Sequence, residues 1–417
     1  MPENFHIDMP EAVRNIIHTI EEHGFKAYAV GGCIRDSILG RNPDDWDITT
    51  SAVPSQIKTF FKRTVDTGIA HGTVTIMIDK TGYEVTTYRI DGEYEDGRHP
   101  KSVEFSDRLV DDLCRRDFTI NAMAYNDTDG FVDEFKGLDD LDTKIIRCVG
   151  EPELRFTEDA LRMMRAIRFS AQLGFTIDEV TWNAIKKLSP SISKISMERV
   201  HVELGKTLMS AHPDYVAQYS EAGLFAPILP VIDNALKSRY KRKILATLQH
   251  TPDNIYLRYA ALFITSTPDE AAKTLRALKL DNKTVNTVSK LVELSKMDIE
   301  ETEPAVRTAL NKYGRDFLPL WHELMMAVIQ ASEDITGISN PAKVKHLLTL
   351  KRLGTDILAR GDCFTIKDLD ISGNDLIEYG LQGHEIGETL KSLLDIVIEN
   401  PKLNDKATLI AMIEHIK

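Results

Sequence analysis

Two aspartates separated by one residue, Asp45 and Asp47, have the clearest capacity for chemistry in this 417-residue chain. We predict a short strand over Trp46–Thr49, and residues two apart on a strand point to the same face. Two carboxylates on one face repel each other unless a cation joins them, and Mg²⁺ prefers hard oxygen ligands. Two such ions, about 3.5–4 Å apart, could activate an attacking hydroxyl and a leaving phosphate together. Glu84, on a later predicted strand, is either a third acidic ligand or a solvent-facing glutamate.

An isolated Asp-x-Asp motif is usually surface charge, so the residues before it matter. The adjacent glycines Gly31 and Gly32 follow a predicted strand and precede a predicted helix. Glycines at that junction let backbone N–H groups approach a phosphate. Arg35 lies one turn into the helix, where its guanidinium could reach the same phosphate. The order of strand, glycine pair, arginine and Asp-x-Asp is much more specific than any of these parts.

Short strands and turns must position these residues. We predict strands over Lys26–Val30, Thr73–Ile78 and Tyr83–Tyr88, with a hairpin turn at Asp79–Gly82 between the last two. A short helix is predicted over Cys33–Leu39. From about residue 153 onward, apolar residues recur at helical spacing. The pattern predicts an α+β chain in which a small α/β head precedes a long all-α body.

Composition limits where the chain works and what it binds. Its formal net charge is −13, which argues against a general nucleic-acid coat but allows a local basic groove. The four cysteines are scattered without a Cys-x-x-Cys pair, which argues against a zinc site or a disulfide framework. The start of the chain has no apolar signal region, and no apolar run is long enough for a bilayer. We therefore expect a cytoplasmic protein with no membrane partner.

The glycine pair and the Asp-x-Asp motif resemble the first motif of class II tRNA nucleotidyltransferases and the related bacterial poly(A) polymerases. Other segments agree with later motifs of this family, and the match runs over roughly the first half of the chain. These segments are Arg115–Ala122, Glu158–Phe169 with Leu173–Phe175, and Ser196–Arg199. Cys33 and Ile34 replace a more usual small residue and valine, and neither needs to contact a substrate.

The resemblance implies a nucleotidyltransferase head with a mixed or antiparallel sheet, followed by an all-α neck, body and tail. We place the head at residues 1–150, the base-selecting neck at 151–208, and the tRNA-binding body and tail at 209–330 and 331–417. By motif, Asp45 and Asp47 would bind Mg²⁺ in the catalytic site, and Glu84, from its place on a predicted strand, is the third catalytic candidate. Gly32 and Arg35 would meet the triphosphate. Arg116, with Asp117 and Asn121, would hold the sugar side.

The hydrogen-bonding groups of Asp159 and Arg162 suggest how a protein could choose bases. The two residues are three apart, so we expect them to be neighbours on one helix surface. A carboxylate accepts hydrogen bonds and a guanidinium donates them. Cytosine and adenine each present an amino donor beside a ring-nitrogen acceptor, whereas guanine and uracil present the reverse. Such a pair would accept CTP and ATP and reject GTP and UTP. Arg165 and Arg168 continue the polar side and could reach the triphosphate.

The implied reaction is addition of C, C and A to the 3′ end of tRNA from CTP and ATP, with release of pyrophosphate. Three alternatives stay open: CC-only addition, A-only addition, and a poly(A) polymerase. The polar segment Asp91–Pro100, with Arg98, sits where the family has a loop that helps switch specificity from C to A. The partner would be the tRNA acceptor arm, and a homodimer is compatible with the sequence. A basic cluster at Lys237–Lys243 is a candidate phosphate-binding surface or a solvated face.

Overall fold

The computed structural model describes residues 6–92 and 103–416. These residues form two compact units, 1–233 and 234–417, each with its own core. The predicted specificity-switching loop lies, from residue 93 on, outside the described residues, as does Arg98. The two units do not correspond to the predicted four-part division, which stays a prediction.

The first unit is built on a seven-stranded mixed sheet with strand order β3-β4-β5-β2-β1-β8-β9. The pairing of β2 with β5 is parallel, and the other neighbouring pairs are antiparallel. The sheet strands are β1 (Ala27–Val30), β2 (Ile48–Thr50), β3 (Thr64–Gly68), β4 (Thr73–Ile78), β5 (Thr81–Thr87), β8 (Ala124–Asn126) and β9 (Gly130–Val132). Two smaller sheets pair β6 (Arg89–Asp91) with β7 (Val103–Phe105) and β10 (Ile145–Ile146) with β11 (Thr176–Ile177). The predicted mixed sheet is therefore confirmed.

The β4–β5 hairpin turns on two residues, Asp79 and Lys80, which both have positive φ angles, of 47° and 71°. This is the backbone that a two-residue turn between twisted strands requires. The hairpin was predicted, but Thr81 and Gly82 belong to β5 and not to the turn, because Thr81 pairs with Ile78 and Gly82 with Met77.

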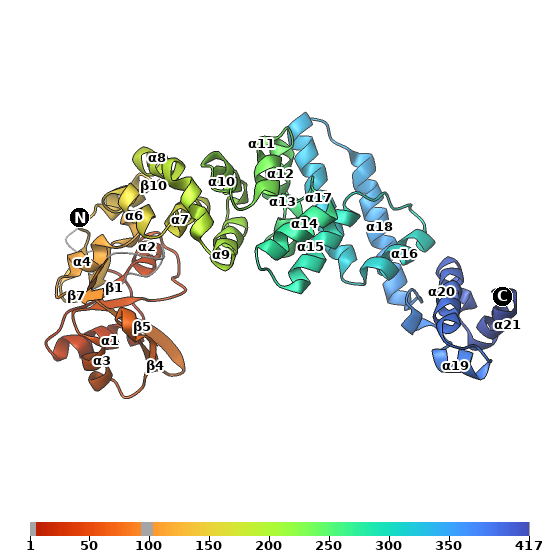
Figure 1. Cartoon of the computed structure of the whole chain (residues 1–417), viewed down its shortest axis with the longest axis horizontal. Coiled ribbons are helices and arrows are strands. Elements are labelled where there is room, and N and C mark those ends of the chain that lie inside the picture. The colour runs from red at the N-terminus through yellow and green to blue at the C-terminus, as the bar shows by residue number, and fades with distance from the viewer. Residues whose placement is uncertain (1–5, 93–102, 417) are drawn as a thin grey trace. The chain divides into compact units, whose positions relative to one another are not determined.

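Short helices pack against the strands of this sheet (Figure 1). In α1, the buried residues Val13, Ile16, Ile17 and Ile20 follow helical spacing, so one face packs on the core. The helices of the first unit are α1 (Glu11–Glu22), α2 (Gly32–Ile38), α3 (Pro54–Phe60), α4 (Leu109–Cys114), α5 (Gly137–Asp142), α6 (Pro152–Glu158), α7 (Leu161–Leu173), α8 (Glu179–Leu188), α9 (Met197–Leu208) and α10 (Ala217–Glu221), with α11 (Pro230–Lys237) at the boundary. Four 3₁₀ turns complete it: η1 (Ile69–His71), η2 (Thr119–Asn121), η3 (Ser189–Lys194) and η4 (Pro213–Val216).

The second unit is entirely helical in its described residues, as predicted. Several of its helices begin at side-chain caps that the sequence supplies, such as Asp281, which accepts from the Thr284 N–H at 2.9 Å. They are α12 (Lys241–His250), α13 (Ile255–Leu262), α14 (Pro268–Ala277), α15 (Asn282–Leu294), α16 (Glu303–Tyr313), α17 (Phe317–Thr336), α18 (Pro341–Arg360), α19 (Gly373–Glu378), α20 (His384–Glu399) and α21 (Lys406–Ile416). The 3₁₀ turns η5 (Ile366–Asp368) and η6 (Pro401–Leu403) connect the last of these.

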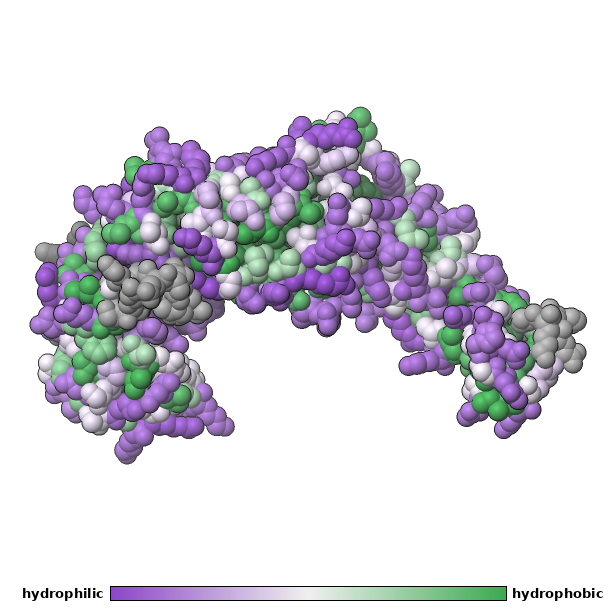
Figure 2. All heavy atoms as spheres, in the orientation of Figure 1, coloured by the Kyte–Doolittle hydropathy of each residue, from purple (hydrophilic) through white to green (hydrophobic). Residues whose placement is uncertain are grey.

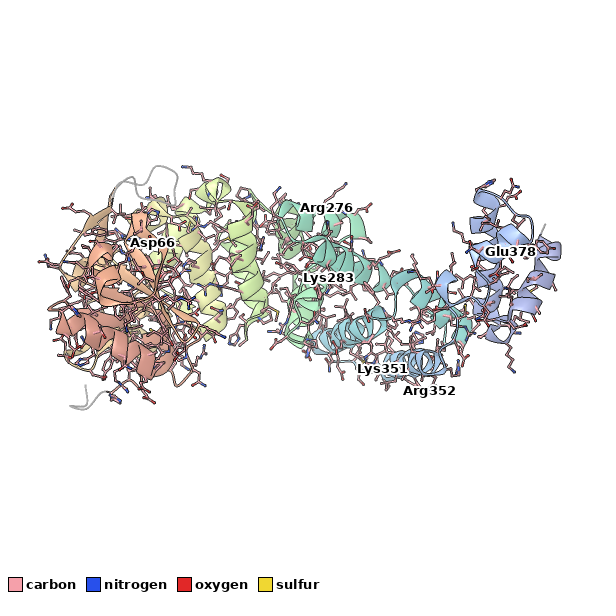
Figure 3. All side chains as sticks on the ribbon, turned by 90° about the horizontal axis from the view of Figure 1, so that it is seen from below. Asp66, Arg276, Lys283, Lys351, Arg352 and Glu378 are labelled. Atoms are coloured by element: carbon pink, nitrogen blue, oxygen red, sulfur yellow. The ribbon has the colours of Figure 1, made fainter. Side chains whose placement is uncertain are left out.

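Polar residues dominate the visible surface, and hydrophobic residues show as scattered areas (Figure 2). Basic side chains lie exposed on the second unit, including Arg276 on α14, Lys283 on α15, and the adjacent pair Lys351 and Arg352 on α18 (Figure 3). None of the described helices is both long enough and apolar enough to cross a membrane.

Candidate active site

The Asp45–Asp47 segment lies directly before β2 and not within a strand as predicted. The ladder between β1 and β2 runs from Ile48 to Thr50, and the last bond before it is donated by the Val30 N–H to the Asp47 carbonyl at 3.0 Å. Pro43 lacks an N–H and disfavours regular structure around it, so the chain joins the ladder only at Asp47. Asp45 and Asp47 are exposed, and Glu84 lies on β5, whose Val85 pairs with Ile48.

The three carboxylates are close enough to influence one another. Burial by surrounding protein raises the pKa of Asp47 above its ordinary value, Arg116 opposes this shift, and Asp45 adds to it by repulsion. The pKa of Glu84 is also raised, first by burial and then by the charges of Asp47 and Asp45. Asp47 is nevertheless solvent-exposed, so nearby protein atoms surround its carboxylate without covering it. The result is an acidic site with incomplete charge compensation.

Such a donor set fits a hard divalent cation, since it offers only carboxylate oxygens and repulsion that a cation would relieve. Within the described part of the chain, however, no group of three or more His, Cys, Asp or Glu side chains is arranged to hold a metal ion. The fit therefore rests on the Asp45–Asp47 pair. Glu84 is brought near this pair but does not complete a three-ligand cluster.

The glycine turn before α2 lies against Arg116, which belongs to the second motif segment, Arg115–Ala122. Gly31 has a φ of 86° and ψ of −128°, a backbone conformation that residues with a Cβ rarely adopt. A Cβ at this position would lie 2.9 Å from Nη1 of Arg116. At Gly32 the nearest atom would be Arg35 Nη2 at 3.7 Å, an ordinary contact. The steric requirement for glycine thus falls on Gly31 of the pair, while the triphosphate contact predicted for Gly32 stays a prediction.

Replacing Gly31 with alanine should displace Arg116 and weaken nucleotide binding. Gly24 is the matched control, because its φ is 84° but a Cβ there would meet nothing within 4 Å. We expect both alanine variants to lose about 1 kcal/mol of unfolding free energy from backbone strain. Only Gly31→Ala should raise the nucleotide KM. Equal KM values for the two variants, with both folded, would contradict the role given to the Arg116 contact.

Asp112 organises the arginine pair that follows α4. It is fully buried and accepts from Arg115 Nη2 at 2.6 Å, from Arg116 Nη2 at 3.2 Å and from Thr49 Oγ1 at 3.1 Å. Its burial raises the pKa, but attraction from Arg115 and Arg116 outweighs that effect, so the pKa of Asp112 is lowered. The Nε of Arg116 is buried and has no hydrogen-bond partner among the residues that the structure describes. An unpaired donor at this point favours an anionic ligand beside it.

Arg116 is part of a polar pocket of about 280 Å³. The lining consists of five arginines, two aspartates and one leucine: Arg115, Arg116, Arg162, Arg165, Arg199, Asp117, Asp159 and Leu161. The excess of guanidinium groups makes the pocket locally positive in a chain whose net charge is −13. It is therefore suited to a polyanion such as a nucleoside triphosphate.

Asp159 and Arg162 both line this pocket, but they do not share one helix as predicted. Asp159 directly follows the last residue of α6, with an extended φ of −143°, and Arg162 lies in the first turn of α7. Arg199 of α9 holds Asp159 through two hydrogen bonds, of 3.2 Å to Oδ1 and 2.7 Å to Oδ2. Arg162 donates to Glu158 Oε2 at 2.9 Å and to the Arg115 carbonyl at 3.0 Å.

Both groups keep hydrogen-bonding capacity for a ligand. A carboxylate has about four acceptor sites, and Asp159 uses three of them, two for Arg199 and one for the Leu161 N–H. A guanidinium has five N–H donors. The bonds of Arg162 to Glu158, to Arg115 and, at 3.5 Å, to the Arg155 carbonyl leave two donors. This capacity is what the predicted reading of a cytosine or adenine edge requires, and that reading stays a prediction.

Arg165 joins the pocket wall to the segment of the second motif. Its Nε and Nη2 lie 2.7 and 2.6 Å from Asp117 Oδ2, and Asn121 donates to Oδ1 at 3.1 Å. Burial alone would raise the pKa of Asp117, but attraction to Arg165 and the bond from Asn121 hold it well below its usual range. Asp117 is therefore charged and fully engaged, and it fixes Arg165.

Asp117→Asn should lower the unfolding free energy by about 1–3 kcal/mol at pH 7, because Arg165 loses its counter-charge. A native pKa below the unfolded one gives stability that is present above about pH 4 and lost as pH falls through the native value. The penalty of the variant should consequently shrink below about pH 4 in urea denaturation. The exposed pair Lys58–Asp66, at 2.8 Å, supplies the control. Asp66→Asn should change stability by less than about 1 kcal/mol at any pH.

Two predicted triphosphate ligands lie inside the protein and not on the pocket wall. Arg35 donates to Asn121 Oδ1 at 2.6 Å and to both oxygens of Asp36 at 3.0 and 2.7 Å. Arg168 is buried and donates to Glu203 Oε2 at 2.5 Å and to Gln172 Oε1 at 2.7 Å. The structure thus brings together Arg116, Asp159, Arg162 and Arg165, while Arg35 and Arg168 stand behind them.

Residue-level reasoning did not single out Arg115, Asp112 or Arg199. Arg115 and Arg199 lie within the matched motif segments, so the resemblance held the signal for both. Asp112 precedes Arg115 and Arg116 by three and four residues, a spacing that pairs side chains on a helix.

Family models match three successive segments of the chain. "Poly A polymerase head domain" matches residues 27–147, "Probable RNA and SrmB- binding site of polymerase A" matches 174–236, and a tRNA nucleotidyltransferase domain 2 model matches 256–413. A CCA-adding enzyme of Pediococcus pentosaceus is 34% identical over 98% of both chains. That of Limosilactobacillus fermentum is 37% identical over 96% of this chain and 95% of its own. The chain belongs to the CCA-adding enzyme family. The resemblance predicted from the sequence is confirmed. The prediction that the chain is a nucleotidyltransferase is confirmed as well.

Solved structures of CCA-adding enzymes have the same fold. The Bacillus stearothermophilus enzyme in complex with CTP aligns over 97% of this chain and 96% of its own, with a TM-score of 0.75 and 32% identity. The Thermotoga maritima enzyme complexed with tRNA aligns over 97% of this chain and 95% of its own, with a TM-score of 0.59 and 21% identity. The expected α+β class, a mixed-sheet head followed by helices, is confirmed.

Proposed function

We propose that this chain adds C, C and A in turn to the 3′ end of tRNA, using CTP and ATP and releasing pyrophosphate. The observation that carries this proposal is the pocket in which Asp159 and Arg162 stand together beside a cluster of further arginines. Arg116 links the pocket to the acidic site, since its charge acts on the Asp47 carboxylate. Base recognition and phosphate chemistry are thus available side by side within the first unit.

Different residues of the pocket would bind the base, the triphosphate and the sugar of the nucleotide. The free acceptor site of Asp159 would take the N4 or N6 amino hydrogen, and Arg162 would donate to N3 of cytosine or N1 of adenine. Guanine and uracil would place a carbonyl acceptor against the Asp159 carboxylate and a ring N–H donor against the Arg162 guanidinium. The polar groups left unpaired would cost about 1–3 kcal/mol each. Arg165 would bind the triphosphate together with Gly32 of α2, and Arg35 would support them from behind the pocket through Asn121. Arg116 and Asn121 would hold the sugar side, with Asp117 fixing Asn121.

Asp45 and Asp47 would hold Mg²⁺, with Glu84 as a further catalytic carboxylate. Mg²⁺ supplies positive charge that stabilises a phosphoryl group in transfer and lowers the pKa of a bound hydroxyl. The chain's own contribution is to hold the two aspartates next to β1 and to bring Arg116 toward them. Arg168 acts from the interior, by fixing α7 against α9 through Glu203.

The acceptor arm of tRNA is the proposed macromolecular partner, and exposed basic groups of the second unit would contact its phosphates. Lys237, Arg239, Lys241, Arg242 and Lys243 lie at the end of α11 and the start of α12. Arg239 stacks on Tyr240 with its Cζ 4.9 Å from the ring centroid. A cytoplasmic location is part of this proposal, because tRNA, CTP and ATP meet there.

The deciding experiment supplies each labelled nucleotide singly, and then in mixture, to a tRNA that lacks its last three nucleotides. We expect CMP incorporation from CTP alone, full-length CCA ends with CTP and ATP, and no extension with GTP or UTP. Long A tails would indicate a poly(A) polymerase, and extension that stops after CC would indicate a partial enzyme. Light scattering of the same preparation distinguishes a homodimer from a monomer.

A further inference from the structure

Three guanidinium groups surround one aromatic ring behind the pocket. The ring of Phe169, on α7, has the Cζ atoms of Arg168, Arg35 and Arg165 at 3.8, 5.1 and 5.3 Å from its centroid. The residue is only 5% exposed, so these contacts are largely shielded from water. A cation within about 6 Å of a ring face is attracted by the ring quadrupole, and the attraction grows on desolvation.

Three like charges at such close range would repel one another without compensation. Each arginine has one carboxylate partner: Asp36 for Arg35 at 2.7 Å, Asp117 for Arg165 at 2.6 Å, and Glu203 for Arg168 at 2.5 Å. These acids come from different elements, whereas all three arginines contact the same ring. A leucine of similar size would fill the space but would offer no π face.

Arg35 and Arg165, two of the three arginines that contact Phe169, are also joined by a series of hydrogen bonds. Arg35 donates to Asn121 at 2.6 Å, Asn121 donates to Asp117 at 3.1 Å, and Arg165 donates to Asp117 at 2.7 Å. This series of hydrogen bonds begins and ends at an arginine that contacts the ring of Phe169. Phe169 therefore touches both ends of a network that connects α2, the segment of the second motif and α7.

We propose that Phe169 is a positioning residue that holds Arg35 and Arg165 in the orientation needed for the phosphates of the incoming nucleotide. This inference rests on the proposed function and deepens it, because it assigns to a buried apolar side chain the organisation of the phosphate side. In the described residues, the cations over the ring are Arg35, Arg165 and Arg168, and the base reader Arg162 is not among them. Loss of the ring should therefore act equally on CTP and ATP and leave the choice of base unchanged.

Phe169→Leu is the test variant, and Phe225→Leu is its control. Phe225 is fully buried in the same unit and packs on Tyr219 with centroids 4.9 Å apart, and in the described residues no cation contacts its ring. Both variants lose aromatic packing, and only the first loses cation contacts. Phe169→Tyr retains a π face and serves as the conservative variant.

Binding of inorganic tripolyphosphate, measured by titration calorimetry, isolates the phosphate contribution from base, sugar and tRNA. We expect Phe169→Leu to raise its Kd, and the KM for both CTP and ATP, by a common factor of about 3 to 30. The kcat should change less than the KM. Phe225→Leu should keep the Kd of the unmodified chain, and Phe169→Tyr should stay within about threefold of it.

The inference is overturned if Phe169→Leu and Phe225→Leu bind tripolyphosphate alike. A KM change for only one of the two nucleotides, or a tyrosine variant as weak as the leucine variant, overturns it as well. Because the titration needs neither tRNA nor turnover, a failure of CCA addition by the unmodified chain would count against the proposed function alone.

Discussion

Asp45→Ala should abolish nucleotide incorporation while the protein stays folded. The aspartate is exposed and lies before β2, so its removal takes away no core packing. A metal site contributes several kcal/mol of transition-state stabilisation, and each 1.36 kcal/mol is a factor of ten in rate. We therefore expect kcat/KM for CTP to fall on the order of 10³-fold or more, measured by CMP incorporation on truncated tRNA.

The neighbouring Asp44 provides the matched control, since it is equally exposed and carries the same charge. Asp44→Asn should retain activity within a few-fold, and both variants should keep the thermal midpoint of the unmodified chain. An Asp45→Ala variant with near-normal incorporation would refute the metal-binding role. A lowered midpoint in that variant alone would instead indicate a structural role.

Asp159→Ala should weaken the selection of bases. The variant removes the acceptor that faces the amino group of cytosine or adenine, and it leaves Arg199 without its bidentate partner. An unmade hydrogen bond at a buried polar site costs about 1–3 kcal/mol. The kcat/KM for CTP and ATP should therefore fall by about 5- to 150-fold. The values for GTP and UTP, measured on the same tRNA, should stay unchanged or rise.

The variant Arg199→Ala tests whether base selection depends on the Asp159 carboxylate itself or on its support by Arg199. It leaves the Asp159 carboxylate in place but removes its support from α9. We expect CTP and ATP to lose efficiency together while GTP and UTP stay rejected, because the acceptor is still present. Selectivity unchanged in Asp159→Ala would exclude Asp159 as the reader, whatever the Arg199 variant does.

The sequence allowed prediction of those features that depend on local backbone rules. The β4–β5 hairpin, the helix after the glycine pair and the all-α second unit follow from turn residues and periodicity, which act over a few residues. The boundary of β2 was placed too early, because pairing with β1, and not local propensity, decides where the ladder starts. Strand ends depend on a partner that is distant in sequence.

The sequence predicted which residues belong to the candidate site better than it predicted how they are arranged. Helical spacing suggested one surface for Asp159 and Arg162, but the helix breaks at Asp159, whose carboxylate is engaged by Arg199 forty residues later. Spacing likewise placed Arg168 on a polar face, although Glu203 and the ring of Phe169 bury it. Both outcomes depend on tertiary partners that no local pattern contains.

The surplus of arginines in the small pocket also affects how the enzyme would behave among other RNAs. Positive potential is concentrated where a nucleotide fits, while the chain as a whole is strongly acidic. Bulk polyanions would then meet long-range repulsion, screened over about 8 Å at physiological salt, and molecules that enter the recess would gain attraction there. Such a distribution would limit sequestration by abundant ribosomal RNA and would hasten departure of a finished tRNA.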